Sequence, residues 1–294
     1  MTATADNFDS IPQLPPELID AANSGALVIF VGAGISRLVG LPGWDGFAAS
    51  VLQQLVSSGI IDYYQESQIK SIPDARKWLS IANIIAKKAD HEIDYNQLFT
   101  IKTPKNPIYE HLNQYKCTFV TTNYDKLIAP AHWKGVPEEN WRYYERKDIL
   151  PDKLDKDFVI HLHGCISVPK SMVVTTKDYL EHYTNESSSV AAFLQHLFSK
   201  KTVLFIGYGL EEVEILEYIL KFSAQREQNH KQIFILQGFF DSNKPLFDSL
   251  EAFYKESFNA ELIGYSLNQN SYSQQEKIIE NWLQKLKFGN LSLA

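Results

Sequence analysis

The stretch Ala-Leu-Val-Ile-Phe-Val-Gly-Ala-Gly-Ile-Ser, residues 26–36, decides the fold. Its apolar run at 27–31 is unbroken, which is typical of a strand covered on both faces, as in a parallel sheet. The run ends in Gly32-Ala33-Gly34, and Ser36 can cap a following helix. A strand, a glycine turn and a helix bring backbone N–H groups and the positive end of a helix dipole together, which attracts phosphate. The stretch therefore predicts either a nucleotide site or an ordinary tight strand–helix turn.

Apolar runs rich in β-branched and aromatic residues recur along the chain and predict further strands. They lie at 117–122, 157–163, 202–206, 231–236 and 261–266. Segments with helical spacing alternate with them, at 47–55, 75–88, 95–100, 107–115, 179–198, 211–224 and 274–286. Because strands that alternate with helices are typical of a doubly wound parallel sheet, we expect an α/β fold of the Rossmann-like type.

We expect one domain over residues 1–294 with two additions to the sheet and its helices. Residues 60–115 show helical periodicity and no strand-like alternation, which predicts a helical insertion or subdomain. This insertion either serves packing alone or forms a lid over a site. Residues 1–13 are polar, and we interpret them as a flexible arm or, alternatively, as an oligomer contact.

Composition excludes several classes of function. The chain of 294 residues is 45% hydrophobic, which is enough for a sizeable core. Its formal net charge of −7 disfavours direct nucleic-acid binding by the whole surface. Two cysteines, Cys117 and Cys165, cannot form a four-cysteine zinc site. Without a signal-peptide pattern or an apolar run of about 18 residues, we expect a cytoplasmic protein with no membrane contact.

Small and polar residues follow four of the apolar runs. These endings are Gly-Ala-Gly-Ile-Ser, Asn-Tyr-Asp, His-Gly and Gly-Tyr-Gly. Ligands of open α/β sheets bind at the carboxyl ends of the strands, so the four endings predict a cleft for a phosphate-bearing ligand. Arg37 stands where a dinucleotide fingerprint needs its third glycine, and no Gly-Lys-Ser/Thr follows the turn. Hydride-transfer and phosphate-loop enzymes are therefore disfavoured.

The strand endings and the residues around them, in their order along the chain, resemble motifs of the sirtuin family. Gly32-Ala33-Gly34-Ile35-Ser36 with Gly40-Leu41-Pro42 looks like the sirtuin opening motif. Thr122-Asn123-Tyr124-Asp125 looks like its Thr-x-Asn-x-Asp element, and His163-Gly164 like its catalytic pair. Gly207-Tyr208-Gly209-Leu210 sits where sirtuins hold the ribose side of NAD. The resemblance covers roughly residues 24–240 and implies a sirtuin-type sheet that binds NAD and breaks its nicotinamide–ribose bond.

The sequence also differs from the protein deacylases of that family. Gly43-Trp44-Asp45 replaces their acidic-Phe-Arg sequence, and the zinc ribbon that helps to bind acylated peptides is missing. The chain looks more like the bacterial sirtuin-like NAD hydrolases of antiphage defence, with NAD as substrate and no metal. That likeness implies a homo-oligomer and a partner such as a HerA-class motor ATPase or an Argonaute-like protein.

The resemblance and the chemistry together suggest roles for individual residues. We expect His163 to act as a base, Asn123 to hold the ribose and the attacking water, and Asp125 to orient the site or offset developing charge. The expected NAD contacts are Gly32, Ala33, Gly34, Ser36, Asp45, Thr122, Gly207 and Leu210, with Asp45 at the nicotinamide end.

Some of these residues also have a purely structural interpretation. His163 can be a core histidine, and Asn123 and Asp125 can cap a helix at 124–128. His161 alternates with His163, so it points to the opposite face and is interpreted as structural.

Two other functions stay open beside NAD hydrolysis. A non-catalytic subunit that senses NAD or ADP-ribose would keep the glycine turn but would not depend on His163. A protein deacylase or ADP-ribosyltransferase would release acetyl from a peptide or transfer label from NAD to protein.

Overall fold

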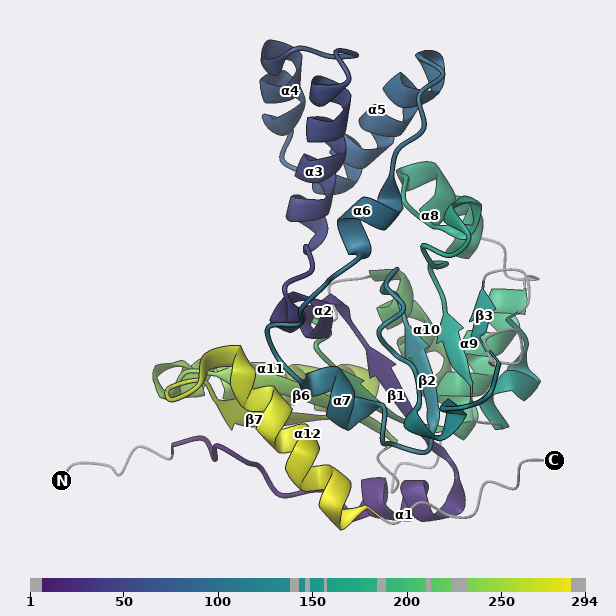
Figure 1. Ribbon diagram of the computed structural model, residues 1–294. Helices are drawn as coiled ribbons and strands as arrows, with labels where there is room; N and C mark the ends of the chain where they lie inside the picture. The colour runs from purple at the N-terminus through teal and green to yellow at the C-terminus, as the bar shows by residue number, and fades with distance from the viewer. Residues whose placement is uncertain are drawn as a thin grey trace.

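The computed structural model describes residues 7–137, 143–145, 149–155, 158–183, 189–209, 213–223 and 232–286. These residues form a sheet of seven strands in the order β3-β4-β2-β1-β5-β6-β7, and every neighbouring pair is parallel (Figure 1). The strands are β1 (Leu27–Val31), β2 (Thr118–Thr121), β3 (Tyr143–Glu145), β4 (Val159–His161), β5 (Thr202–Ile206), β6 (Ile233–Phe239) and β7 (Ala260–Ser266). The expected doubly wound α/β sheet is confirmed.

The central strand β1 is buried on both faces, as its unbroken apolar run predicts. Val28 and Phe30 point into the hydrophobic core on one side of the sheet. Leu27, Ile29 and Val31 point into the core on the other side. Because successive side chains of a strand point to opposite faces, alternate residues of this apolar run belong to two separate cores.

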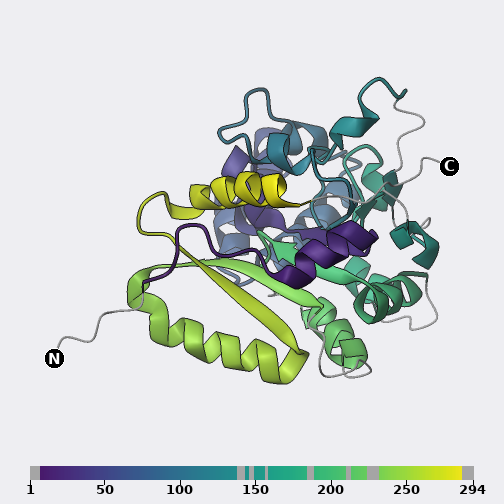
Figure 2. The ribbon, with the colours of Figure 1, turned by 90° about the horizontal axis from the view of Figure 1, so that it is seen from below.

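Helices cover both faces of this sheet. The core that contains Leu27 is closed by α1 (Pro16–Ser24), α7 (Ile108–Leu112) and α12 (Gln274–Lys285). The core that contains Phe30 is closed by α9 (Ser189–Lys200), α10 (Val213–Ser223) and α11 (Lys244–Phe258). Figure 2 shows β6 and β7 lying between α11 and α12. The predicted helix at 179–198 is two helices, α8 (Thr176–Tyr183) and α9.

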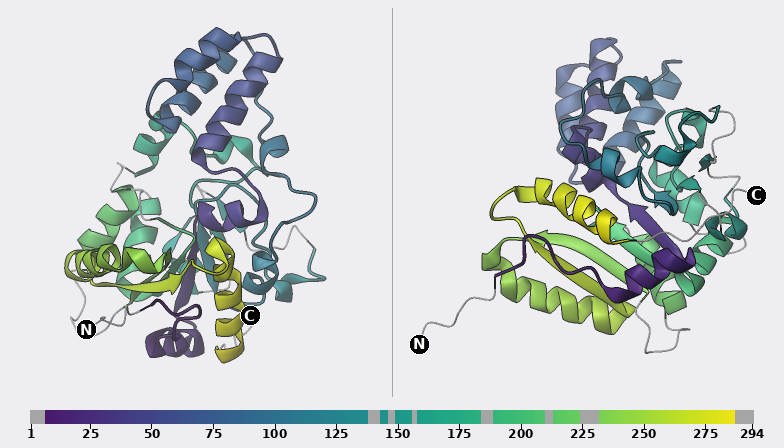
Figure 3. Two further views of the ribbon diagram at one scale, coloured as in Figure 1. Left: turned by 90° about the vertical axis from the view of Figure 1, so that its left-hand side faces the viewer. Right: turned by 60° about the horizontal axis from the view of Figure 1, so that its bottom comes forward.

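A helical unit stands over the carboxyl ends of the central strands (Figures 1 and 3). It consists of α3 (Trp44–Ser57), α4 (Tyr63–Lys70), α5 (Ala75–Lys88) and α6 (Tyr95–Phe99). Its own core joins Phe47 and Leu52 of α3 to Leu79 of α5, and it extends to Tyr124 and Cys165 below. The unit begins before residue 60, at α3, whereas α7 belongs to the layer on the sheet.

The described part of the expected N-terminal arm is docked on the sheet. Phe8 stacks on Phe239 with ring centroids 5.5 Å apart, and Ser266 N–H donates to the Asp9 carbonyl at 3.0 Å. The Trp282 indole donates to the Pro12 carbonyl at 3.0 Å. These contacts fix residues 8–12, which differs from the flexible arm expected for 1–13; residues 1–6 lie outside the described chain.

Two further features concern the chain as a whole. Cys117 and Cys165 are both buried and unlinked. Within the described ranges, every helix is too short or too polar to cross a membrane.

Candidate active site

The predicted strand endings meet where the strand order reverses. β1 pairs with β2 on one side and with β5 on the other, so the strand order reverses beside β1, and the carboxyl end of such a position is where α/β sheets bind ligands. The turn into α2 (Ala33–Val39) follows β1, and Asn123 follows β2. His163 follows β4, and Gly207 follows β5. The sheet therefore brings the four predicted endings to one edge.

Ser36 is the centre of a buried hydrogen-bond network at this edge. Its hydroxyl donates to Asp125 Oδ2 at 2.7 Å and accepts from Asn123 Nδ2 at 2.9 Å. The hydroxyl of Tyr109, on α7, lies 3.0 Å from the same oxygen. Because Ser36 gives its one hydrogen to Asp125, Tyr109 must be the donor to Ser36. The serine hydroxyl is thus fully used within the protein.

This network fixes the orientation of the Asn123 side chain. Nδ2 donates to the Gly32 carbonyl at 3.0 Å as well as to Ser36, which uses both amide hydrogens. The Asn123 backbone N–H donates to Thr121 Oγ1 at 3.0 Å, and Thr121 Oγ1 donates to the Val31 carbonyl at 2.8 Å. These hydrogen bonds use the amide nitrogen and the backbone N–H but not Oδ1, so the amide oxygen is the candidate end of this side chain for a ligand.

Asp125 is one step removed from Asn123 in this network. It is 2% exposed and accepts from Ser36 and from the Leu127 backbone N–H, the latter at 3.0 Å. Burial raises the pKa of Asp125 above its usual value, and the hydrogen bonds from Ser36 and Leu127 oppose that rise. Burial also raises the pKa of Tyr109 well above its usual value, so its hydroxyl keeps its proton. Asp125 therefore contacts Asn123 only indirectly, through Ser36.

The glycines of the β1–α2 turn let two loops touch. A Cβ on Gly34 would lie 2.7 Å from the Gly207 carbonyl oxygen, and one on Gly32 would lie 2.5 Å from the same atom. The Gly34 N–H donates to the Gly207 carbonyl at 2.8 Å, and the Gly32 N–H donates to the Ile206 carbonyl at 2.9 Å. Two donors expected to face phosphate are therefore used inside the protein, and the glycines are required for packing.

The loops after β2 and β4 are joined to each other. The Ile166 N–H donates to the Tyr124 carbonyl at 3.0 Å, and the Tyr124 hydroxyl donates to the Val173 carbonyl at 2.6 Å. The Val173 N–H donates in turn to the His163 carbonyl at 2.9 Å. The backbones that carry Asn123 and His163 thus belong to one hydrogen-bonded assembly.

His163 is fully buried, at 0% exposure, under helix α8. Its Nε2 lies 2.6 Å from the Tyr183 hydroxyl, and its Nδ1 lies 3.3 Å from the Tyr179 hydroxyl. The ring of Tyr179 also meets the imidazole edge-on at 4.9 Å between centroids. Both ring nitrogens therefore contact tyrosine hydroxyls from one helix.

His161 supports the same loop from below. Its Nδ1 lies 3.1 Å from the Asn123 backbone carbonyl, and burial lowers its pKa to about 4. The imidazole is thus neutral near pH 7, which fits the structural role expected for it.

The other predicted site residues have three different outcomes. Thr122 is buried beside Asn123, and Ala33 is half-buried in the turn. Asp45 is exposed in the first turn of α3 and makes no hydrogen bond or ion pair to a described residue, so the structure does not join it to Asn123 or His163. Leu210 lies outside the described residues.

The structure adds residues that the sequence did not mark. Tyr109, Tyr179, Tyr183 and Thr121 contact the predicted site. Thr121 lies at the end of a predicted strand, next to the Asn-x-Asp element, and this position alone could have marked it as a neighbour of the site. The three tyrosines come from helices distant in sequence, so no local pattern could identify them.

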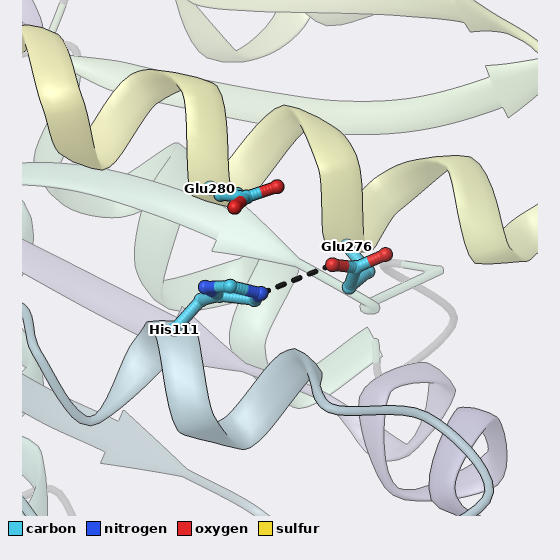
Figure 4. Close-up of side chains that lie close together, drawn as sticks. All are labelled: His111, Glu276 and Glu280. Carbon is cyan, nitrogen blue, oxygen red and sulfur yellow. Dashed lines mark hydrogen bonds and ion pairs between the residues drawn. The ribbon is translucent and has the colours of Figure 1, made fainter.

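One set of possible metal ligands exists among the described residues (Figure 4). His111 on α7 and Glu276 and Glu280 on α12 bring three ligand atoms within 4.8 Å of one another. His111 Nε2 lies 3.0 Å from Glu276 Oε1, and Glu280 is exposed. The His111–Glu276 pair ties α7 to α12 without an ion, and we assign it this structural role.

Comparisons with known proteins find one matching family model and several similar proteins. The family model described as SIR2-like domain matches residues 117–263, which is half of the chain. The protein named defense-associated sirtuin 2, from Bacillus subtilis, is 26% identical over 226 residues, covering 74% of this chain and 21% of that protein.

Proteins named NAD(+) hydrolase ThsA are also similar. The one from Bacillus cereus is 25% identical over 290 residues, 90% of this chain and 56% of its own. The one from Cytobacillus dafuensis is 26% identical over 212 residues, 69% of this chain and 39% of its own. The chain therefore spans between about a fifth and just over half of the length of these relatives.

Proposed function

The chain belongs to the SIR2-like domain family, and from that premise we propose that it hydrolyses NAD to nicotinamide and ADP-ribose. The relatives named NAD(+) hydrolase support NAD as the substrate and hydrolysis as the reaction. The observation that carries the proposal is the orientation of Asn123. Its amide nitrogen is held by Gly32 and Ser36 at the switch point of the sheet, and neither of these bonds uses its amide oxygen, which in the proposal faces the ligand.

The reaction needs little acid catalysis. The bond between the ribose C1′ and the nicotinamide nitrogen breaks, and nicotinamide leaves as a neutral molecule with the bonding electron pair. Positive charge develops on the ribose, as in glycoside hydrolysis. A water oxygen then bonds to C1′, and the proton that it loses passes to a base. Fixed geometry and a nearby base are what the protein must supply.

The residues of the site supply these two functions in the proposal. Asn123 Oδ1 accepts a hydrogen bond from the attacking water or a ribose hydroxyl, and Asp125 and Tyr109 hold it in place through Ser36. His163 is the base, once its nitrogens are released from α8. The remaining proposed NAD contacts are Gly32, Ala33, Gly34, Thr122, Gly207, Leu210 and, at the nicotinamide end, Asp45.

We place this activity in bacterial antiphage defence. The name of the Bacillus subtilis relative supports that setting. In this proposal the chain is a cytoplasmic effector that depletes NAD, assembles as a homo-oligomer and answers to a partner such as a HerA-class motor ATPase or an Argonaute-like protein. Control by a partner fits an enzyme whose unrestrained activity would consume a central metabolite.

The test is nicotinamide release from NAD by the purified chain, alone and with the products of neighbouring genes. Asn123→Ala and His163→Ala should each lower the rate by about 100-fold or more, since each removes a positioned group from the reacting centre. Asn96→Ala and His196→Gln, which change the same residue types outside the site, should leave the rate unchanged. Wild-type protein that releases no nicotinamide under any of these conditions contradicts the proposal.

A second candidate is a subunit that binds NAD or ADP-ribose without cleaving it. The observation in its favour is that both nitrogens of His163 contact tyrosine hydroxyls. In this case calorimetry should detect binding of NAD to the wild type, and His163→Ala should bind NAD equally well while nicotinamide never appears.

A further inference from the structure

His163 cannot act as a base in the arrangement that the structure shows. A neutral imidazole has one N–H and one lone pair, and the Tyr179 and Tyr183 hydroxyls face both positions. The ring is 0% exposed, so neither a water nor a ribose hydroxyl can reach it. Tyr179 and Tyr183 are themselves only 3% and 6% exposed. Access therefore requires that α8 moves.

Helix α8 is docked at its other end on the helical unit. The Thr176 backbone N–H, at the start of α8, donates to Ser80 Oγ of α5 at 2.9 Å. Since this N–H opens the helix, Ser80 acts as an N-terminal cap supplied by a different helix. The first turn of α8 is also capped locally, since the Asp178 N–H donates to Thr175 Oγ1 at 3.2 Å, and the Ser80 hydroxyl adds a contact that ties this turn to α5.

An aromatic and cationic contact continues this docking. The Arg76 guanidinium, also on α5, lies 4.5 Å from the ring centroid of Tyr179 and 5.8 Å from that of Trp44. The rings of Trp44 and Tyr179 lie 6.1 Å apart. Tyr179 thus contacts the helical unit through its ring and His163 through its hydroxyl, so one side chain joins the two.

We propose that Tyr179 and Tyr183 form a latch, which holds the imidazole of His163 out of reaction while α8 is docked on the helical unit. Undocking of α8 from α5 withdraws both hydroxyls together and opens His163 to the substrate. The latch gives the helical unit control of the base, in addition to the NAD contact proposed for Asp45 on α3. The inference rests on the proposed function, in which His163 is the base.

The energies involved suit a reversible latch. A net hydrogen bond stabilises by about 1 kcal/mol, and a cation–π contact by a similar amount. Loss of one such contact multiplies a small open fraction about fivefold, and the observed rate rises by the same factor. A partner that pulls on the helical unit breaks several contacts at once and would produce a larger rise.

The experiment compares Tyr183→Phe, Tyr179→Phe and Ser80→Ala with the wild-type full chain. Each tyrosine variant keeps its ring and loses one hydroxyl, and Ser80→Ala loosens α8 without touching the site. The control is Lys177→Ala, which removes an exposed ion pair with Glu181 on the outer face of α8. Two quantities are measured: nicotinamide release from NAD, and the rate at which diethyl pyrocarbonate modifies His163, read by peptide mass spectrometry.

The latch predicts that all three variants raise both rates about fivefold and that the control raises neither. A Tyr183→Phe protein that hydrolyses NAD more slowly while His163 stays protected overturns the latch, because Tyr183 would then pass the proton instead. Wild-type His163 that reacts as fast as in the urea-unfolded chain overturns it too. If no protein hydrolyses NAD but the variants expose His163, the latch stands and the proposed hydrolase activity falls.

Discussion

At the scale of single residues, one hydroxyl organises the site. Ser36 has three polar partners, Tyr109 on α7 and Asn123 and Asp125 in the loop after β2, and these bonds leave the Asn123 amide oxygen unused. Buried polar groups are stable only when their hydrogen bonds are complete, and this network satisfies that condition at Ser36. A sirtuin-like serine that was expected to touch NAD therefore serves first to aim an asparagine.

His161 makes stability depend on pH in a definite direction. Its pKa falls from 6.5 to about 4 on folding because the ring is buried. Between these pH values the unfolded chain takes up a proton that the folded chain does not. The contribution of His161 to stability is therefore complete above pH 6.5 and is lost as the pH falls toward 4, by about 3 kcal/mol.

Urea unfolding at pH 7 and pH 4.5 measures this effect. His161→Gln cannot take up the proton, so its free energy of unfolding should fall less than that of the wild type between the two pH values. Equal falls in both proteins would show that His161 does not carry the dependence.

The sequence identifies the residues that lie on the strand ends and misses those that approach from elsewhere. Asn123, Asp125 and Ser36 were expected together because parallel strands end at one edge, and the structure joins them. Their roles as NAD contacts stay predictions. Tyr109 and the two tyrosines of α8 reach the site only through tertiary packing, which no spacing in the chain encodes.

At the scale of elements, the β1–α2 turn depends on its contact with the end of β5. Gly34→Ala should destabilise the protein by about 1 to 3 kcal/mol, because the new Cβ would lie 2.7 Å from a backbone oxygen that cannot rotate away. Gly46→Ala is the matched control, since its Cβ would meet only the Pro42 side chain, at 3.3 Å, in the first turn of α3.

Thermal unfolding of the two variants gives the comparison. Gly46→Ala should be neutral or slightly stabilising, because alanine is the better helix former. A Gly34→Ala protein as stable as the wild type would show that the two loops can separate without loss.

Elements with a strong apolar period were predicted from the sequence, and elements without one were not. The six strands predicted from apolar runs are all present, because a strand buried on both faces leaves an unmistakable run. β3 has only three residues, Tyr143–Glu145, too few to form an apolar run, and it was not predicted. α11 was not predicted. Only Phe247, Tyr254 and Phe258 of its fifteen residues are buried, and so few buried positions do not form a clear apolar period in the sequence.

At the scale of the whole molecule, the N-terminal segment packs against the end of the sheet formed by β6 and β7 and against α11. Phe8 packs between Phe239 and Phe247, the latter at 5.1 Å between ring centroids. Phe8→Ala should therefore lower the free energy of unfolding by about 1 to 2 kcal/mol, since it exposes these rings. Phe240→Ala removes a ring of the same type that is 49% exposed and should change stability by less than about 0.5 kcal/mol.

Urea titrations of both variants decide whether the segment is part of the fold. Equal midpoints for Phe8→Ala and wild type would mean that the segment rests on the surface without supporting it.

The cross-linked loops after β2 and β4 have a consequence for how this protein tolerates change. Because the Tyr124 hydroxyl and the Val173 N–H tie the two loops together, the asparagine and the histidine shift as a single rigid piece. Substitutions in either loop then disturb the same geometry. Their effects on the free energy of unfolding should therefore not be additive when substitutions in both loops are combined. Such a centre is therefore retuned by paired replacements in the two loops rather than by single ones.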